Sequence, residues 1–181
     1  MKEQETRKMP RIFWFFLAAM MLPWLGMNIW SAPKIEALSG GLRLPEMRLT
    51  GYSFEDLQAF LAAIGDEGRD FYLGVQLWLD MLFPPLLAAV LFLCFRWLYP
   101  GFAGRIIGTA SLSSVVIDYL ENAALAVILR AGPEALTLEM AAEANQWTIA
   151  KWTLAQVGLA ALIIGIGLRI RRRWMAKRVR P

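Results

Sequence analysis

The fold is decided by the apolar stretch FYLGVQLWLDMLFPPLLAAVLFLCFRWLY at residues 71–99, which carries one acid, Asp80, and one base near its end, Arg96. A helix needs about 20 mainly apolar residues to cross the hydrocarbon core of a bilayer. Three more stretches of this kind occupy residues 12–30, 106–129 and 147–170 of the 181-residue chain. We therefore predict an all-α fold, a four-transmembrane-helix bundle that forms a single integral membrane domain over residues 1–181.

The composition excludes a soluble globule and a disordered chain. Hydrophobic residues make up 57% of the chain, charged residues make up 19%, and the mean hydropathy is +0.45. An average soluble domain is about 45–50% apolar and about 25% charged. The chain has no histidine and one cysteine, Cys94, so a disulfide, a histidine-held haem and the usual zinc ligand sets are excluded. We expect no cofactor and no metal.

Lysine and arginine positions predict the orientation. The N-terminal tail, the short connection between the second and third spans, and the tail at 171–181 are basic, whereas the connections 31–70 and 130–146 are acidic. By the positive-inside rule, both termini are cytoplasmic and the protein is a multi-pass protein of the cell inner membrane. The same rule, with contact to anionic lipid, accounts for the basic tail, so we expect no nucleic acid partner. Trp30 at the −3 position of any cleavage after Ala32 favours a retained first helix over a signal peptide.

The external connection between the first and second spans is expected to be partly helical. Ser53 with Asp56 matches a capping box, and apolar residues then recur at helical spacing until Gly65. This pattern predicts a short amphipathic helix, either on the outer leaflet or over the mouth of the bundle, as part of an external cap at residues 31–70. Residues 134–144 predict a second, weaker external helix.

Polar residues inside the spans are the candidate site, because an ionisable group in a transmembrane segment costs several kcal/mol unless it is paired, neutralised or hydrated. In the second span the spacing of 3, 4 and 4 residues places four polar side chains on one helix face. The third span carries two acids one turn apart with an amide beside them, and the fourth carries a lysine. The candidate ion- or ligand-binding residues are therefore Arg69, Tyr72, Gln76, Asp80, Asp118, Glu121, Asn122 and Lys151.

Depths along the helices, at about 1.5 Å per residue, place these groups in the outer half and middle of the bundle. Fully ionised, the three acids and Lys151 sum to −2, which suits protons, a cation or a small polar ligand. Pro84 and Pro85 withhold two amide donors next to Asp80 and predict a kink. The alternative is structural: the prolines only bend the helix, the acids form a packing cluster, and Lys151 extends to the interface. Gly104 and Gly108 form a G-x-x-x-G pattern for close helix approach.

The runs GYSFEDLQAFLAAIGDEGRDFYLGVQLWLDMLFP at 51–84 and DYLEN at 118–122 resemble a group of bacterial four-span membrane proteins with no established activity. The matching positions lie in these two runs: Gly51, Tyr52, Gly68, Arg69, Tyr72, Asp80, Pro84 and residues 118–122. The two runs cover about a fifth of the chain. The resemblance implies the four-span topology and implies no mechanism.

Three functions remain open from the sequence. The first is an outward-facing intramembrane polar cavity that binds a cation, a proton or a small polar ligand, in transport or sensing. The second is an intramembrane enzyme acting on a lipid or lipid-linked substrate, with Asp118 or Glu121 as general acid or base and Lys151 or Arg69 stabilising negative charge. The third is a structural or assembly subunit of a membrane complex. Besides the lipid bilayer, we expect a homo-oligomer or a partner membrane subunit, because four helices are few for a stand-alone transporter.

Overall fold

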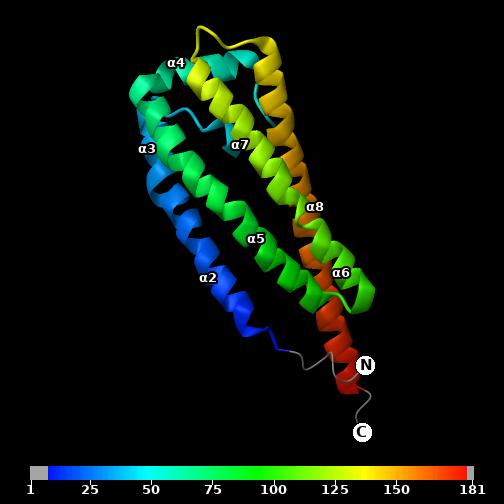
Figure 1. Ribbon diagram of the computed structural model, residues 1–181. Coiled ribbons are helices and arrows are strands. Elements are labelled where there is room, and N and C mark those ends of the chain that lie inside the picture. Colours follow the sequence, from blue (N-terminus) through cyan, green and yellow to red (C-terminus); the bar gives the residue numbers. More distant parts are fainter. Residues whose placement is uncertain (1–7, 179–181) are drawn as a thin grey trace.

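A computed structural model describes residues 8–178 of the chain as helices joined by short connections (Figure 1). Two π-helical turns, η1 and η3, and one 3-10 turn, η2, interrupt or join the α-helices. The elements in chain order are α2 (Arg11–Leu25), η1 (Gly26–Ser31), α3 (Ala32–Leu38), η2 (Pro45–Met47), α4 (Phe54–Phe71), η3 (Tyr72–Gln76), α5 (Leu77–Leu98), α6 (Gly101–Ala110), α7 (Ser113–Ala131) and α8 (Leu138–Arg178).

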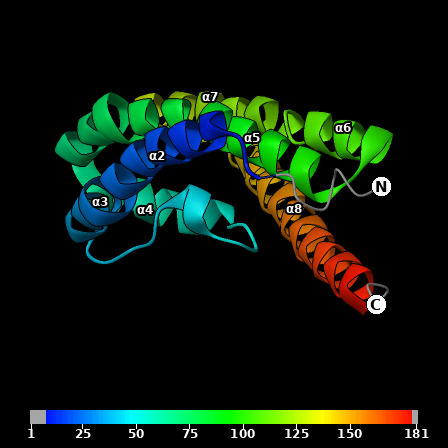
Figure 2. The same ribbon diagram turned by 90° about the horizontal axis from the view of Figure 1, so that it is seen from below.

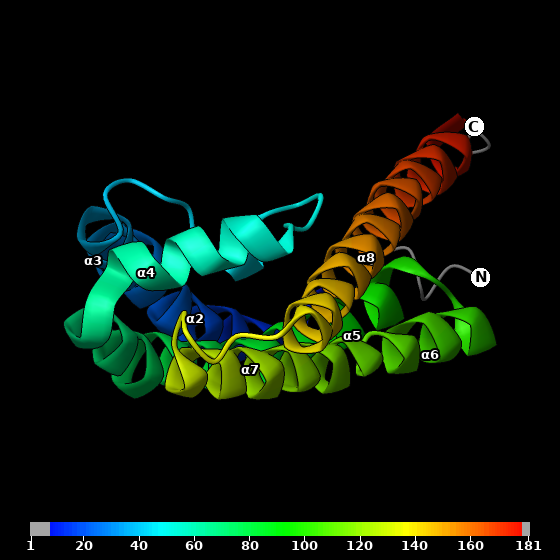
Figure 3. The same ribbon diagram turned by 90° about the horizontal axis from the view of Figure 1, so that it is seen from above.

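Four helical stretches are long and apolar enough to cross a membrane: Arg11–Leu38, Phe54–Leu98, Gly101–Ala131 and Leu138–Met175. This confirms the predicted all-α fold with four membrane-compatible helices. Figures 2 and 3 show α2, α5, α6 and α7 side by side in one layer, with α4 and α8 on the same side of that layer. The start of α2 and the end of α8 lie at the same end of the molecule, which we call the tail end. The opposite end, where α4 lies, is called the strap end, after the connection at residues 39–53.

Several helices are longer than the spans predicted from hydropathy. The first continues past Trp30 through η1 and α3 to Leu38, and the last begins at Leu138, within the segment predicted as a separate external helix. The second is also continuous through Pro84 and Pro85, where a kink was expected. The carbonyl of Met81, which Pro85 leaves without its helical donor, accepts a hydrogen bond of 3.0 Å from the hydroxyl of Tyr119 on α7. A neighbouring helix therefore supplies the donor that the proline removes.

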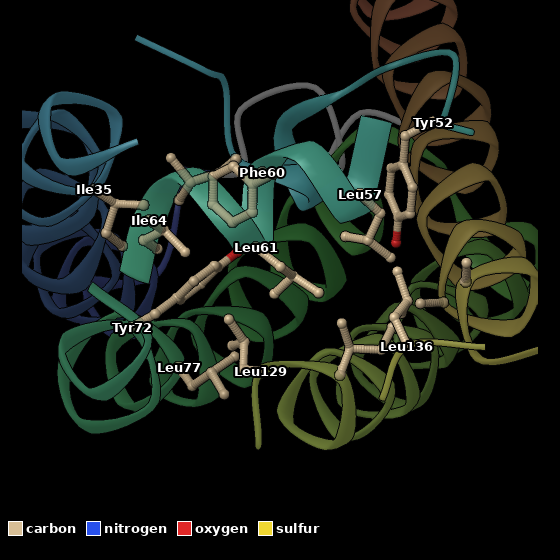
Figure 4. Close-up of a cluster of buried hydrophobic side chains, with 14 of the residues drawn as sticks. Ile35, Tyr52, Leu57, Phe60, Leu61, Ile64, Tyr72, Leu77, Leu129 and Leu136 are labelled. Carbon is tan, nitrogen blue, oxygen red and sulfur yellow. The ribbon is translucent and has the colours of Figure 1, made fainter. Parts of the chain in front are cut away.

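The predicted amphipathic helix is the first part of α4. The capping box is present, because Asp56 donates its amide to Ser53 and accepts from the Ser53 amide, each at 3.1 Å. At Gly65, α4 is kinked, and its remaining residues lead into the second span. The φ of Gly65 is 63°, a backbone conformation that favours glycine. Figure 4 shows the apolar face of α4 pointing into a buried cluster with residues of α3, η3, α5 and α7. Its members from α4 are Leu57, Phe60, Leu61 and Ile64. The helix therefore covers the bundle at the strap end.

The G-x-x-x-G pattern of α6 is a close contact with the end of α5. A Cβ atom built on Gly104 would lie 2.3 Å from the carbonyl oxygen of Tyr99, and one on Gly108 would lie 3.1 Å from the ring of Phe92. Contacts under 3.0 Å to a backbone atom require the helices to move apart. The expectation that this helix end approaches a neighbour closely is confirmed.

We predict that Gly104→Ala lowers the stability of the protein by about 1–3 kcal/mol, because a single methyl group overpacks the contact between α5 and α6. The matched control is Gly158→Ala on α8, where a new Cβ meets nothing within 4 Å. Alanine there is expected to cause no loss. Thermal unfolding of the purified full-length protein in detergent measures both. Equal melting temperatures for the two variants would contradict the assignment of Gly104 to a tight helix contact.

Candidate functional site

The centre of the site is a buried ion pair between two spans. Lys151 on α8 pairs with Oε2 of Glu121 on α7, whose side chain is fully buried. The second carboxylate oxygen, Oε1, accepts a hydrogen bond of 2.6 Å from the hydroxyl of Thr148, one turn before Lys151 on the same face of α8. Since α7 and α8 pack along each other, the acid is held by two donors of one neighbouring helix.

Two further acids surround Lys151. Asp80 on α5 is 8% exposed and interacts electrostatically with Lys151, and its Oδ2 atom has no hydrogen-bond partner. Asp118 on α7 is half-buried and interacts with Lys151, Asp80 and Glu121. The amide of Asn122 lies beside Asp80, but neither of its polar atoms reaches a hydrogen-bond partner. Three spans thus direct polar side chains to one region.

A fourth acid comes from the connection between the first two spans. Glu46 lies in η2, within residues 39–53, a segment that we call the strap, and only 5% of it is exposed. The hydroxyl of Tyr72 donates to its Oε2, and the Gln76 amide donates to its Oε1 at 3.2 Å. The indole N–H of Trp152 on α8 donates to the backbone carbonyl of Glu46 at 3.0 Å. The strap therefore places the carboxylate of Glu46 among the side chains of the second and fourth spans.

Contacts at both ends hold the strap in this position. Leu44 is fully buried in the apolar cluster beneath α4. The amide of Tyr52 donates to Oδ1 of Asn145 on α8 at 2.9 Å. Gly51, with φ 80°, lies so close to Asn145 that an added Cβ would be 2.2 Å from its Oδ1. Glu46 is therefore fixed by buried contacts on either side of η2.

Burial raises the pKa of Glu46 from 4.5 to about 7, because a carboxylate loses its hydration among apolar side chains. The positive charge of Lys151 and the hydrogen bond from Tyr72 oppose this rise, and the charges of Asp80 and Glu121 add to it. A carboxyl group with this pKa exchanges its proton near neutral pH.

The structure brings together seven of the eight residues predicted for the site, and Arg69 is the exception. Arg69 pairs instead with Asp66, an exposed residue one turn earlier on α4. Sequence reasoning missed Glu46, Thr148 and Trp152. Thr148 could have been found, since it lies one turn from Lys151, but Glu46 stands in the acidic connection between the first two spans and carries no local signal.

The site is a connected set of side chains and has no metal cage. Among residues 8–178, no three acidic or cysteine side chains lie close enough together to hold a metal ion. A shallow surface groove of about 430 Å³ lies elsewhere, between α4 and the connection that precedes α8. Its lining residues are Glu55, Gln58, Ala59, Ala62, Pro133 and Glu134.

Comparison of the chain with protein-family models, with curated proteins and with solved structures finds no match. The geometry of the site is therefore the basis for its interpretation.

We predict that Lys151→Met destabilises the protein by about 3–5 kcal/mol, because it leaves the buried carboxylate of Glu121 without its cation. The double variant Glu121→Gln/Lys151→Met removes both charges and is expected to recover most of the loss. Lys34→Met, at an exposed lysine of α3, is the control. Thermal unfolding in detergent measures all three. A loss for Lys151→Met no larger than that for Lys34→Met would contradict the ion pair.

We predict that Glu46→Gln removes part of the pH dependence of stability. Because the folded-state pKa of Glu46 is raised to about 7, its protonated form stabilises the folded protein below about pH 4.5. That contribution, up to about 3 kcal/mol at 1.36 kcal/mol per pKa unit, is lost as the pH rises to about 7. The difference in melting temperature between the variant and the unchanged protein, measured against pH, isolates this group. A difference that is constant with pH would disprove the assignment.

Proposed function

We propose that this chain is a multi-pass protein of the cell inner membrane, with both termini cytoplasmic, whose buried polar site takes up a proton, a small cation or a small polar ligand from the external side. The uptake serves transport or sensing. One observation carries the proposal: four carboxyl groups, Glu46, Asp80, Asp118 and Glu121, all interact with the single ammonium group of Lys151.

The excess of negative charge supports uptake of positive charge. With all groups ionised, four negative charges and one positive charge sum to −3, one unit more negative than the sum without Glu46. Carboxylates that share a site of low dielectric constant cannot all remain ionised. Protons or a bound cation must therefore balance the site, and the number bound depends on pH.

Polar atoms without partners support a site with room for further hydrogen bonds. Asp80 Oδ2 and Gln76 Oε1 are buried acceptors without a donor, and the amide of Asn122 is buried without a partner on either atom. Buried polar groups in folded proteins are nearly always hydrogen-bonded. A bound cation or polar ligand would satisfy these acceptors.

A second candidate, a structural role in helix packing, is favoured by the direct contacts within the site. Glu121 is engaged by Thr148 and Lys151, and Glu46 is engaged by Tyr72 and Gln76. Such bonds fasten helices together whether or not anything is bound.

The proposal predicts that the protein is stabilised in a cation- or pH-dependent manner that the acids determine. We expect the melting temperature of the full-length protein, measured in detergent from about pH 5 to about pH 9 with sodium, potassium or choline chloride, to change markedly. Asp80→Asn and Asp118→Asn should each weaken that dependence, because each removes one buried carboxyl group that a proton or a cation would neutralise. Glu139→Gln, at an exposed acid of α8, should leave it unchanged.

The two candidates differ in their outcomes. If the Asp80 and Asp118 variants lower the melting temperature by the same amount under every condition, the cluster is structural and the proposed uptake is wrong.

A further inference from the structure

The groups that bind the Glu46 carboxylate all belong to the spans. The hydroxyl of Tyr72 and the amide of Gln76 are at the two ends of η3, in the second span, and both side chains are buried. Lys151 adds a positive charge from the fourth span. The acceptor, in contrast, belongs to the strap, whose one helical turn is η2. The bundle thus forms the donor set, and the strap supplies the carboxylate.

The donors match the chemistry of a carboxylate. Each oxygen of Glu46 accepts one hydrogen bond, Oε2 from Tyr72 and Oε1 from Gln76. Lys151, which pairs with Glu121, also contributes a positive charge near Glu46, while Asp80 and Glu121 contribute negative ones. Two directed donors with a cation are the elements of carboxylate recognition in proteins.

The strap is held against the spans by two hydrogen bonds of its backbone and by a buried apolar contact. The backbone carbonyl of Glu46 is bonded to Trp152, and the amide of Tyr52 is bonded to Asn145. Leu44 supplies the apolar contact. None of these contacts joins one span to another, so their loss on displacement of Glu46 would leave the contacts between the four spans in place.

We propose that Tyr72, Gln76 and Lys151 form a binding subsite for small carboxylates, which Glu46 occupies from within the chain. A free carboxylate ligand competes with Glu46 and releases the strap. This inference names a ligand class for the proposed site and rests on the proposed function only in the claim that the site takes a small ligand. The carboxylate subsite depends on the donors Tyr72, Gln76 and Lys151, whereas the uptake of a proton or cation depends on the acids. Either proposal can therefore be wrong while the other is right.

Truncation of the internal carboxylate tests the subsite. In the full-length protein at neutral pH, Glu46→Ala should lower the melting temperature, and sodium acetate should raise it again in a saturable manner relative to sodium chloride of equal ionic strength. Adding Tyr72→Phe should remove most of the acetate effect. Glu139→Ala, which truncates an exposed acid on α8, is the matched control and should show no acetate effect. A Glu46→Ala protein that folds and shows no saturable response to acetate would overturn the proposal.

The unchanged protein provides a second measurement that does not depend on that variant folding. Because Glu46 is tethered, its effective concentration weakens acetate binding by about tenfold or more relative to Glu46→Ala. With Cys94→Ala as background, Leu44→Cys places a thiol at a buried strap position, and Gln58→Cys places one on the exposed face of α4. High acetate should speed labelling at position 44 by a water-soluble thiol reagent and leave position 58 unchanged. Equal labelling rates with acetate and chloride would count against competition with the strap.

Discussion

A carboxylate inside an apolar helix bundle must have partners, and this requirement determines where the spans of the protein meet. Removing a charge from water costs several kcal/mol that only a well-placed counter-charge and hydrogen bonds can offset. Glu121 is fully buried and is engaged by Lys151 and Thr148. Both donors lie on α8, so the packing of α7 against α8 and the rotation of α8 about its axis follow from this one acid.

The constraint matters most for α8, because much of that helix is exposed to the surroundings of the bundle. Figure 2 shows it running at an angle to the layer of the other spans. Near the tail end it is fastened to the end of α5, where Tyr99 donates to the carbonyl of Ala161 at 2.6 Å and Arg169 donates to the carbonyl of Trp97 at 3.1 Å. At the strap end Lys151 and Trp152 join it to α7 and to the strap. Polar interactions at two places along its length thus position α8, which has little apolar packing.

The fold and most of the site follow from local patterns in the sequence. Hydropathy predicts four spans because each span must be apolar over its own length. Helical periodicity places Tyr72, Gln76 and Asp80 on one face, and the structure brings this face to Lys151. Glu46 could not be predicted in this way, since its partners are 26 and 30 residues away and an acid in a polar connection normally faces water. Arg69 shares the face of Tyr72 by spacing, but at a helix turn near the surface Asp66 offers a closer partner.

The distribution of charge along the chain places the acids of the spans near the strap. No acid occurs at residues 81–117 or 144–181, so the acids of the spans lie in the half of the bundle towards the strap. The tail half combines apolar side chains with arginines near its end, so a proton or cation on that side would meet positive charge and apolar side chains. For the proposed uptake, the strap end is therefore the more favourable side, and Glu46 is the acid that the strap itself carries. A ligand of the proposed site would there meet a carboxylate that the chain already holds against Tyr72 and Gln76.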